Sequence, residues 1–241
     1  TAPAESYRRV INMTPNAYYR AGLSGTPLAR SDHRSVLAVG SLGRVIYRIK
    51  TETLMDAGLI SRPTIEMRTC EQTSDKQVWA GVYRELVVNS VVRNKLVMGM
   101  VQDSPKPCVV FVTSIQHGKA LAKTGQASGI KCEFIDGKSS LDMRKRAVTR
   151  LEQGDVEALV ATTIFNEGID IPTLAAVVIA SGGASTIQTL QRIGRGMRRT
   201  AEKNTFHVFD VADRGQRWTE RHAKARATAY RSEGHPVTTR P

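Results

Sequence analysis

The chain has 241 residues, of which 41% are hydrophobic, so it is long enough to bury one large or two small cores, and disorder is not expected. Lysine and arginine (35) exceed aspartate and glutamate (22) by 13, which indicates a polyanionic partner, most often nucleic acid, with a merely basic protein as the alternative. The most apolar stretch, 86–101, contains asparagine, arginine and lysine, and the amino terminus has no signal-peptide pattern, so no membrane partner is expected.

The cysteines and histidines give no sign of a disulfide or a metal site. Cys70, Cys108 and Cys132 are odd in number, lack the spacing of a zinc site, and two of them lie in apolar runs. We therefore expect buried, reduced thiols in a cytosolic protein. The histidines at positions 117, 207 and 222 show no ligand spacing, so no metal-binding residue is assigned.

The first 75 residues contain few clear elements. Residues 5–11 are typical of a helix, residues 21–23 of a short strand, and residues 24–27 (Ser-Gly-Thr-Pro) of a turn. Residues 32–59 mix short helical pieces with glycines. This part has too few predicted strands to form a sheet of its own.

A long amphipathic helix is predicted over residues 76–102. Apolar residues recur there mostly at steps of three and four, beginning with Trp79, Val82 and Tyr83. Residues 104–107 (Ser-Pro-Lys-Pro) then break the helix and lead into the next strand.

From residue 108 onward, short β-branched runs alternate with helical patterns. Strands are predicted at 108–112, 131–135, 158–161, 175–180 and 205–211, and helices at 114–128, 140–153, 186–198 and 216–232. Apolar strands separated by helices indicate an α/β fold with a parallel sheet covered by helices on both faces. Because ligands bind beyond the carboxyl ends of such strands, the functional residues should lie in the loops that follow them.

The last of these helices, 216–232, combines basic and aromatic residues. Such a helix can grip or stack on nucleic acid. The preferred interpretation is that an alanine and aromatic stripe packs on the sheet, while the basic residues face solvent (Arg217, Arg221, Lys224 and Arg231).

The segment 161–172, Ala-Thr-Thr-Ile-Phe-Asn-Glu-Gly-Ile-Asp-Ile-Pro, follows a predicted buried strand and carries groups suited to phosphate and ribose. Thr162 and Thr163 offer hydroxyls and amides beyond the sheet edge, where phosphate oxygens are bound without recognition of the base sequence. Gly168 permits close approach of another backbone, and Asp170 supplies an acceptor for a ribose hydroxyl or an arginine. An ordinary connection between two strands is the alternative.

Residues 191–199, Gln-Arg-Ile-Gly-Arg-Gly-Met-Arg-Arg, place arginines at spacings of three and four around a glycine. At helical pitch Gln191, Arg195 and Arg198 share one face, and guanidinium groups bind phosphate oxygens bidentately. A solvated basic helix face is the alternative. Gly194 and Gly196 each cost about 1 kcal/mol of helix propensity relative to alanine, which favours a site where a phosphate or another domain comes close.

In their order along the chain, these segments resemble the motifs of superfamily 2 nucleic-acid helicases. Residues 23–27 (Leu-Ser-Gly-Thr-Pro) resemble motif III, residues 110–114 (Val-Phe-Val-Thr-Ser) motif IV, residues 161–172 motif V and residues 191–199 motif VI. A weaker match, 134–138 (Phe-Ile-Asp-Gly-Lys) with Arg144 behind it, resembles the point where related proteins turn from strand to helix near the nucleic acid. The resemblance implies a RecA-like fold, with ATP bound between two such domains.

The resemblance also implies a role for each matched residue. Arg195 and Arg198 would be the catalytic arginine fingers on the γ-phosphate of ATP. The other implied groups are ATP-binding (Gly168, Asp170, Gln191 and Arg192), coupling (Ser24, Gly25 and Thr26) and nucleic-acid-binding (Thr113, Ser114, Gly137, Thr162 and Thr163).

The sequence has no G-x-x-x-x-G-K-[ST] loop and no Asp-Glu pair of the D-E-x-H/D type. In the family these hold the phosphates of ATP and Mg²⁺, so we expect that this chain alone does not hydrolyse ATP and that an amino-terminal half outside this sequence binds most of both. Because motif III follows the metal-binding box in the family, the sequence is expected to begin just after that box. Residues 1–71 are then the tail of the first RecA-like domain, and residues 72–241 are the second, the helicase C-terminal domain.

The predicted function is that of the C-terminal half of an ATP-dependent helicase or translocase. Motifs V and VI are closer to restriction-translocase, repair and phage helicases than to DEAD-box RNA proteins, which usually carry histidine where Gln191 stands, so DNA is favoured over RNA. The expected location is the cytoplasm of a bacterial, phage-infected or viral host cell. The alternative is a non-catalytic nucleic-acid-binding or regulatory module; loss of the finger arginines would indicate it, and both are present.

Overall fold

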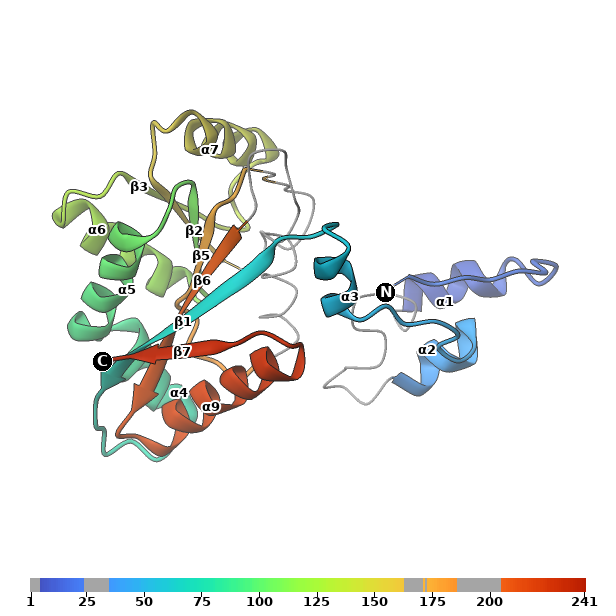
Figure 1. The fold of residues 1–241 in the computed structure, drawn as a ribbon, viewed down its shortest axis with the longest axis horizontal. Helices are drawn as coiled ribbons and strands as arrows, with labels where there is room; N and C mark the ends of the chain where they lie inside the picture. Colours follow the sequence, from blue (N-terminus) through green and yellow to red (C-terminus); the bar gives the residue numbers. More distant parts are fainter. Residues whose placement is uncertain (1–4, 24–34, 163–170, 172, 186–204) are drawn as a thin grey trace. The chain divides into compact units, whose positions relative to one another are not determined.

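The computed structural model describes residues 5–23, 35–162, 171, 173–185 and 205–241 (Figure 1). Its contacts divide the chain into two compact units, Thr1–Lys50 and Thr51–Pro241. This division lies earlier than the predicted boundary after residue 71, because residues 62–71 form a strand within the sheet of the second unit.

The described part of the first unit contains two helices, α1 (Glu5–Asn12) and α2 (Ser35–Leu42). The helix predicted at residues 5–11 is therefore confirmed. Residues 21–23, which are predicted to form a short strand, lie in neither a strand nor a helix. Large apolar side chains are exposed here, and Tyr18, Tyr19 and Leu23 each expose at least 88% of their surface. The described residues of this unit therefore form no buried core of their own.

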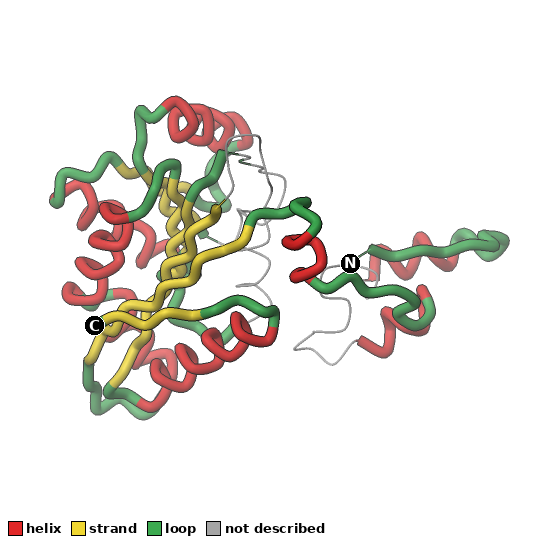
Figure 2. The backbone as a smooth tube through the Cα atoms, viewed as in Figure 1, coloured by secondary structure: helices red, strands yellow, loops and turns green. Residues whose placement is uncertain are grey.

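The second unit begins with a short helix, α3 (Thr51–Asp56), and is built around one seven-stranded sheet (Figures 1 and 2). In spatial order the strands run β3-β4-β2-β5-β6-β1-β7, and every neighbouring pair is parallel. The predicted α/β fold with a parallel sheet is confirmed. The strands are β1 (Arg62–Glu71), β2 (Cys108–Phe111), β3 (Cys132–Ile135), β4 (Ala158–Ala161), β5 (Ala176–Ile179), β6 (Thr205–Arg214) and β7 (Val237–Arg240).

Two of these strands, β1 and β7, have no counterpart among the predicted elements. In the first half of β1, buried residues such as Ile65 and Met67 alternate with more exposed ones, which is the pattern of a strand beside a core. Its outward positions carry Thr, Glu and Arg, which weaken a strand signal in the sequence. β7 has four residues and pairs with β1, and such a short segment carries no measurable periodicity.

Helices cover both faces of the sheet (Figure 1). Along β2, alternate residues point into two separate cores, because successive side chains of a strand face opposite sides. Val109 and Phe111 join the core under α7 (Leu141–Gln153) and α9 (Arg217–Ser232). Val110 and Val112 join the core under α5 (Val91–Asp103) and α6 (Ile115–Ala127). Strands β2, β4 and β5 are buried along their whole length, which explains their apolar runs.

The single helix predicted over residues 76–102 is interrupted in the structure. α4 (Trp79–Val82) continues into a π-helical turn, η1 (Tyr83–Val88), whose C-cap is Asn89. Ser90 then begins α5 as its N-cap, since its hydroxyl accepts a hydrogen bond from the backbone N–H of Arg93 at 3.1 Å. The same hydroxyl donates to the side-chain oxygen of Gln72. A capping serine therefore divides an apolar pattern that continues across it in the sequence.

The remaining helices predicted within the described residues are confirmed. α6 and α7 begin at the N-caps Ser114 and Ser140, and α7 ends at Gly154, whose φ of 81° suits glycine. α9 packs its buried face on the sheet and exposes its predicted basic residues, so the preferred packing role is confirmed. None of the helices in the described part of the chain is long and apolar enough to cross a membrane.

Candidate nucleic-acid interface

Three neighbouring strands end together at the carboxyl edge of the sheet. The register pairs the last residue of β2, Phe111, with the last residue of β4, Ala161, which also pairs with the last residue of β3, Ile135. Backbone hydrogen bonds continue the ladder one residue beyond β2 and β4. The loops that follow the three strands therefore leave the sheet side by side. They carry the four predicted nucleic-acid-binding residues that the structure describes (Thr113, Ser114, Gly137 and Thr162).

Thr113 and Ser114 form the turn between β2 and α6. Thr113 is exposed, and the half-buried Ser114 caps α6, because its hydroxyl accepts from the backbone N–H of His117 at 3.4 Å. The other N–H groups of the first helical turn have no intrahelical partner, and the helix dipole favours an anion beside them. This turn therefore presents a hydroxyl and backbone donors beyond the sheet edge.

Gly137 lies in the turn between β3 and α7. The carboxylate of Asp136 shapes this turn by accepting from the backbone N–H groups of Lys138 (2.9 Å) and Ser139 (3.2 Å). The Gly137 carbonyl accepts from Nη2 of Arg144 at 3.1 Å. Gly137 and Lys138 are exposed, so this edge also presents an open backbone next to a second helix amino terminus.

Thr162 differs from Thr113 in its exposure. Its side chain is only 4% exposed, and its hydroxyl has no hydrogen-bond partner among the described residues. Nε of Arg144 is likewise buried and lacks a partner within the described residues. Because a buried, unsatisfied hydroxyl costs about 1–3 kcal/mol, a ligand or chain segment that bonds to Thr162 would stabilise this edge.

His117 lies behind the turn at Ser114 and is fully buried. Its Nε2 lies 3.1 Å from Oδ1 of Asn94. Burial first, and the nearby charge of Arg93 second, lower the pKa of His117 to about 3. His117 is therefore neutral near pH 7 and supports the turn without taking up a proton. Among the described residues, no group of three or more His, Cys, Asp or Glu side chains is placed to hold a metal ion.

The remaining predicted site residues lie outside the described residues, so their assignments stay predictions. They are the coupling residues (Ser24, Gly25 and Thr26), one nucleic-acid-binding residue (Thr163), the ATP-binding residues (Gly168, Asp170, Gln191 and Arg192) and the catalytic arginines (Arg195 and Arg198). The structure does describe the residues that precede the arginine segment, namely β5 and the loop 180–185, here called the β5 loop.

A buried ion pair ties the β5 loop to α5. Arg93 of α5 is fully buried and donates to Asp213 of β6 from both Nε (2.8 Å) and Nη2 (3.2 Å). Its third nitrogen, Nη1, donates to the carbonyl of Ala180 at 2.9 Å. Two residues on, Gly182 has a φ of 67°, and a Cβ there would lie 2.9 Å from a methyl carbon of Val87. The loop is therefore closely packed as well as hydrogen-bonded.

A second buried ion pair ties the same loop to α9 on the opposite face of the sheet. Arg226 donates to Asp210 of β6 from Nε (2.8 Å) and Nη2 (3.0 Å), while its Nη1 donates to the carbonyl of Gly183 at 2.9 Å. The Tyr230 hydroxyl also donates to Asp210, at 2.5 Å. Burial disfavours the charge of Arg226, but the carboxylate of Asp210 outweighs this and raises the pKa of Arg226. The guanidinium therefore stays charged within the core.

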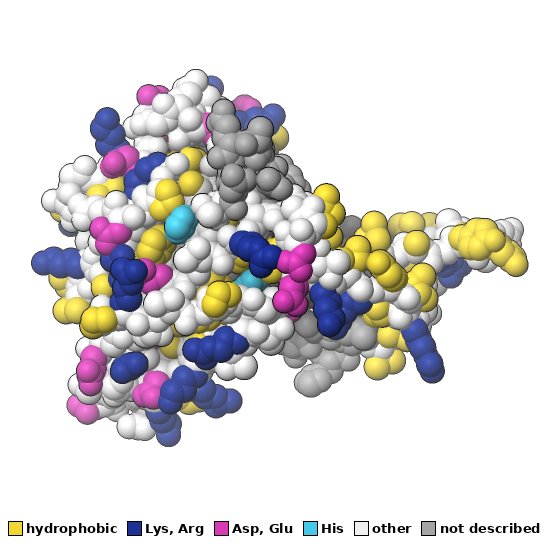
Figure 3. Space-filling view, viewed as in Figure 1, with side chains coloured by type: hydrophobic (Ala, Val, Ile, Leu, Met, Phe, Trp, Pro, Cys, Tyr) yellow, Lys and Arg dark blue, Asp and Glu magenta, His cyan; other side chains and the backbone are white. Residues whose placement is uncertain are grey.

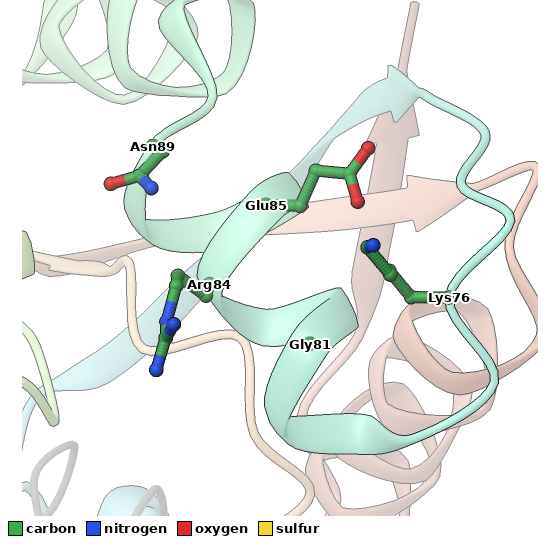
Figure 4. A pocket seen from close by; sticks show the side chains of 5 residues that line it. All are labelled: Lys76, Gly81, Arg84, Glu85 and Asn89. Carbon is green, nitrogen blue, oxygen red and sulfur yellow. The ribbon is translucent and has the colours of Figure 1, made fainter.

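A shallow hollow of about 590 Å³ lies beside α4 and η1 (Figure 4). It is lined by Lys76, Gly81, Arg84, Glu85 and Asn89. In Figure 4, Lys76 and Glu85 point toward one another, whereas Arg84 points away from both. None of the described predicted site residues lines this hollow, and its charges are of both signs, so we assign it no ligand.

The excess positive charge of the chain is not gathered into one patch on the face drawn in Figure 3. Lysine and arginine side chains are spread over that face and interleave with aspartate and glutamate. Charge alone therefore marks no single binding surface on that face.

Comparison with known proteins connects this edge to a family. The family described as the helicase conserved C-terminal domain matches residues 91–200, which begin at α5 and include the carboxyl edge and the arginine segment. Residues 91–200 are therefore similar to the C-terminal domain of helicases.

Two relatives illustrate where such helicase domains occur. A protein of Sulfolobus islandicus filamentous virus (isolate Iceland/Hveragerdi) named as helicase 22 is 28% identical over 226 residues, which cover 87% of this chain and 40% of the relative. The ATP-dependent DNA helicase uvsW of Enterobacteria phage T4 is 27% identical over 224 residues, which cover 88% of this chain and 44% of the relative. The chain spans about two fifths of the length of these curated relatives.

Solved structures share the fold of this chain. T4 UvsW matches with a TM-score of 0.58 at 16% identity, over 86% of this chain and 45% of that chain. Dbp5 of S. cerevisiae, bound to RNA and ADP BeF3, matches with a TM-score of 0.61 at 15% identity, over 98% of this chain and 56% of that chain. At these identities the likeness concerns the fold alone, which is RecA-like.

Sequence reasoning missed the arginines that hold the β5 loop. Arg93 stands in an apolar helix, and Asp210 and Asp213 stand in or next to an apolar strand. A charged residue at a buried position needs a partner, so these positions did carry a signal. Which residues form pairs depends on the tertiary structure, since Arg93 and Asp213 are 120 residues apart in the sequence.

Proposed function

We propose that this chain is the C-terminal half of an ATP-dependent helicase or translocase that moves along a nucleic-acid strand. The match of residues 91–200 to the helicase conserved C-terminal domain and the relatives named as helicases support the proposal. The observation that carries it is the carboxyl edge of the sheet, where the loops after β2, β3 and β4 bring together the four described residues predicted to bind nucleic acid.

The groups at this edge suit the backbone of a strand better than its bases. α6 and α7, each of 13 residues, begin there and offer unpaired N–H groups to phosphate oxygens. Thr113 adds an exposed hydroxyl, and exposed Gly137 permits close approach. Contacts to phosphate and sugar carry no sequence information, and this is what a protein that moves along its track requires.

ATP, as the substrate, is assigned to the cleft between this domain and an amino-terminal RecA-like half. Arg195 and Arg198 reach the γ-phosphate, and an arginine finger is worth about 10³ to 10⁵ in rate. Gly168, Asp170, Gln191 and Arg192 complete this side of the nucleotide pocket, and Thr163 joins the nucleic-acid contacts. The amino-terminal half supplies the phosphate loop and the carboxylates for Mg²⁺.

The first unit is assigned to the end of the first RecA-like domain. Its exposed apolar side chains, such as Tyr18, Tyr19 and Leu23, need a covering surface, which the rest of that domain would provide. Because residues 51–71 belong to the compact second unit, the tail of the first domain extends to about Lys50. The coupling residues Ser24, Gly25 and Thr26 fall within it.

DNA is the preferred track. The T4 relative is named as a DNA helicase, and Gln191 stands where DEAD-box proteins usually carry histidine. The RNA-bound structure of Dbp5 has the same fold, so the fold itself does not separate the two tracks. Both relatives described above come from viruses, which fits a protein that acts in the cytoplasm of an infected cell.

The proposal is tested by recombining this chain with an amino-terminal half that carries the phosphate loop and the acidic metal box. We expect ATP hydrolysis that single-stranded DNA stimulates more strongly than RNA of the same length. Arg195→Ala should reduce turnover about 10³-fold or more, as expected for an arginine finger. Arg199→Ala, in the same segment, is the matched control and should retain turnover. Equal rates for wild-type and Arg195→Ala halves would refute the motor and favour a non-catalytic binding module.

A further inference from the structure

We propose that Arg93 and Arg226 are positioning residues for the arginine segment 191–199, which they hold in place through the β5 loop. The inference rests on the proposed function, in which Arg195 and Arg198 act on ATP. The residue pairs Arg93–Asp213 and Arg226–Asp210 are here called the two loop clamps.

The two loop clamps have the same hydrogen-bonding arrangement. In each, a guanidinium uses two nitrogens on a carboxylate of β6 and its third on a carbonyl of the β5 loop, at 2.9 Å in both cases. The carbonyls belong to Ala180 and Gly183, three residues apart. Arg93 comes from α5 and Arg226 from α9, which cover opposite faces of the sheet. The loop is therefore held from both sides.

Stability alone does not account for this arrangement. All four charged side chains of the clamps expose 3% or less of their surface. A buried ion pair is often no more stabilising than well-packed apolar residues of the same size, because both charges lose their hydration. What apolar residues cannot supply is a donor aimed at a backbone carbonyl. The planar guanidinium fork holds that donor in a fixed direction, which a lysine ammonium does not.

The clamps affect the proposed reaction through the two loop carbonyls that they hold in place. Gly183 lies eight residues before Gln191, the first residue of the arginine segment, so a fixed β5 loop limits the positions that this segment can take. Gly182, in close contact with Val87, restricts the loop further. An arginine finger must meet a phosphate within a fraction of an ångström, and a misplacement of about 1 Å can cost about 10²-fold in rate.

The first test is hydrogen–deuterium exchange on this chain. One variant, Arg93→Met with Asp213→Leu, replaces the first clamp by apolar residues; a second, Arg226→Lys, keeps the charge beside Asp210 but lacks the fork. In both we expect amides of residues 180–199 to exchange about tenfold faster or more, as for a lost hydrogen bond to a charged group. Strand β4 should exchange at the wild-type rate.

Arg68→Met is the matched control. Arg68 bonds to Glu66 of β1 at 2.8 Å and to Asp103 of α5 at 2.6 Å, and neither partner belongs to the β5 loop. It should leave residues 180–199 unchanged. Wild-type exchange of residues 191–199 in the clamp variants would overturn the inference, even if residues 180–185 exchange faster. Circular dichroism checks that each variant is folded; if the double variant is not, Arg226→Lys decides.

The second test measures ATP hydrolysis by the recombined halves. The clamp variants should lower kcat about tenfold to hundredfold, and they should also raise the KM for ATP, because the positioned segment carries the proposed ATP-binding residues Gln191 and Arg192 beside the catalytic arginines. In a background that lacks both catalytic arginines, Arg195→Ala with Arg198→Ala, the same variants should have no further effect on kcat, since they act through those residues. An additive loss would contradict the inference.

The two proposals fail in different ways in this second test. If Arg195→Ala leaves turnover unchanged, the proposed function itself fails. If Arg195→Ala abolishes turnover while the clamp variants keep the wild-type kcat, the motor stands and only the positioning role of Arg93 and Arg226 is refuted.

Discussion

Asp210 and Asp213 lie three residues apart on β6, and their carboxylates bond to arginines on opposite faces of the sheet. Side chains three apart on a strand point to opposite sides, so one strand supplies an anchor to each of the two cores. Through Arg226 and Arg93, both anchors bond to the same loop after β5. The loop that precedes the predicted catalytic arginines in the sequence is therefore anchored from both faces of the sheet.

Arg93→Met alone should lower the free energy of unfolding by about 3–5 kcal/mol, because it leaves the carboxylate of Asp213 buried without its partner. Adding Asp213→Leu should recover most of that loss. Urea unfolding followed by circular dichroism measures both values. Lys224→Met, which removes one partner of an exposed pair with Glu220, should leave stability unchanged within error. If the single and double variants lost the same free energy of unfolding, the loss would come from the changed side-chain shape and not from the unpaired charge of Asp213.

His117 should make the stability of the second unit depend on pH. Its pKa is about 3 in the folded chain and about 6.5 in the unfolded chain, so the unfolded chain binds more protons between these values. The contribution of neutral His117 is fully present above pH 6.5 and is lost as the pH falls toward 3, by about 1.4 kcal/mol per unit at most.

The variant His117→Gln isolates this effect, because glutamine can still donate to Asn94 but does not titrate. Urea midpoints measured from pH 7 to pH 4 should fall less steeply in the variant than in the wild type. Parallel slopes would mean that His117 is already accessible to protons in the folded chain.

Gly215 and Gly234 both have positive φ, of 85° and 79°, but differ in their surroundings. A Cβ at Gly215 would lie 2.7 Å from the carbonyl oxygen of Gln72, whereas a Cβ at Gly234 meets nothing within 4 Å. Gly234→Ala should therefore cost about 1 kcal/mol from backbone conformation alone, and Gly215→Ala at least about 2 kcal/mol. Thermal unfolding of the two variants makes the comparison. A smaller loss at Gly215 would show that the backbone at Gln72 can shift to make room for the added methyl group.

Binding of single-stranded DNA by this chain should weaken steeply with salt. A site that contacts 6–10 phosphates loses about 10³ to 10⁵ in affinity between 50 and 200 mM salt, and the half site on this chain should lose less. Fluorescence anisotropy with labelled oligonucleotides of several sequences measures the slope. Binding that is insensitive to salt and selective for one sequence would argue against backbone contacts.

Thr113→Val should weaken that binding severalfold on every sequence tested, because one neutral hydrogen bond contributes about 0.5–1.5 kcal/mol. Thr149→Val is the control, since Thr149 is also exposed and its hydroxyl bonds to the Lys145 carbonyl within α7. Anisotropy titrations at one salt concentration compare the two variants. If both bind alike, Thr113 makes no contact with the strand.

Many of the central elements could be predicted because their signals are local. β4 lies at the predicted residues 158–161, and α6 and α7 begin at capping serines that the sequence displays. Prediction failed where a signal was weak or misleading. The alternating strand β1 carries charged outward residues, the four residues of β7 are too few for a period, and Ser90 interrupts an otherwise continuous apolar pattern.

The amino-acid sequence alone determined the alternation of strands and helices, the parallel sheet and the kinds of side chain that follow each strand, because these depend on near neighbours and on hydrophobic periodicity. Only the tertiary structure decided the order of the strands, which brings Thr113, Gly137 and Thr162 to one edge. It alone also paired Arg93 with Asp213 across 120 residues. Such contacts form only when the whole sheet is assembled, since the free energy that aligns distant segments comes from the burial of both cores together.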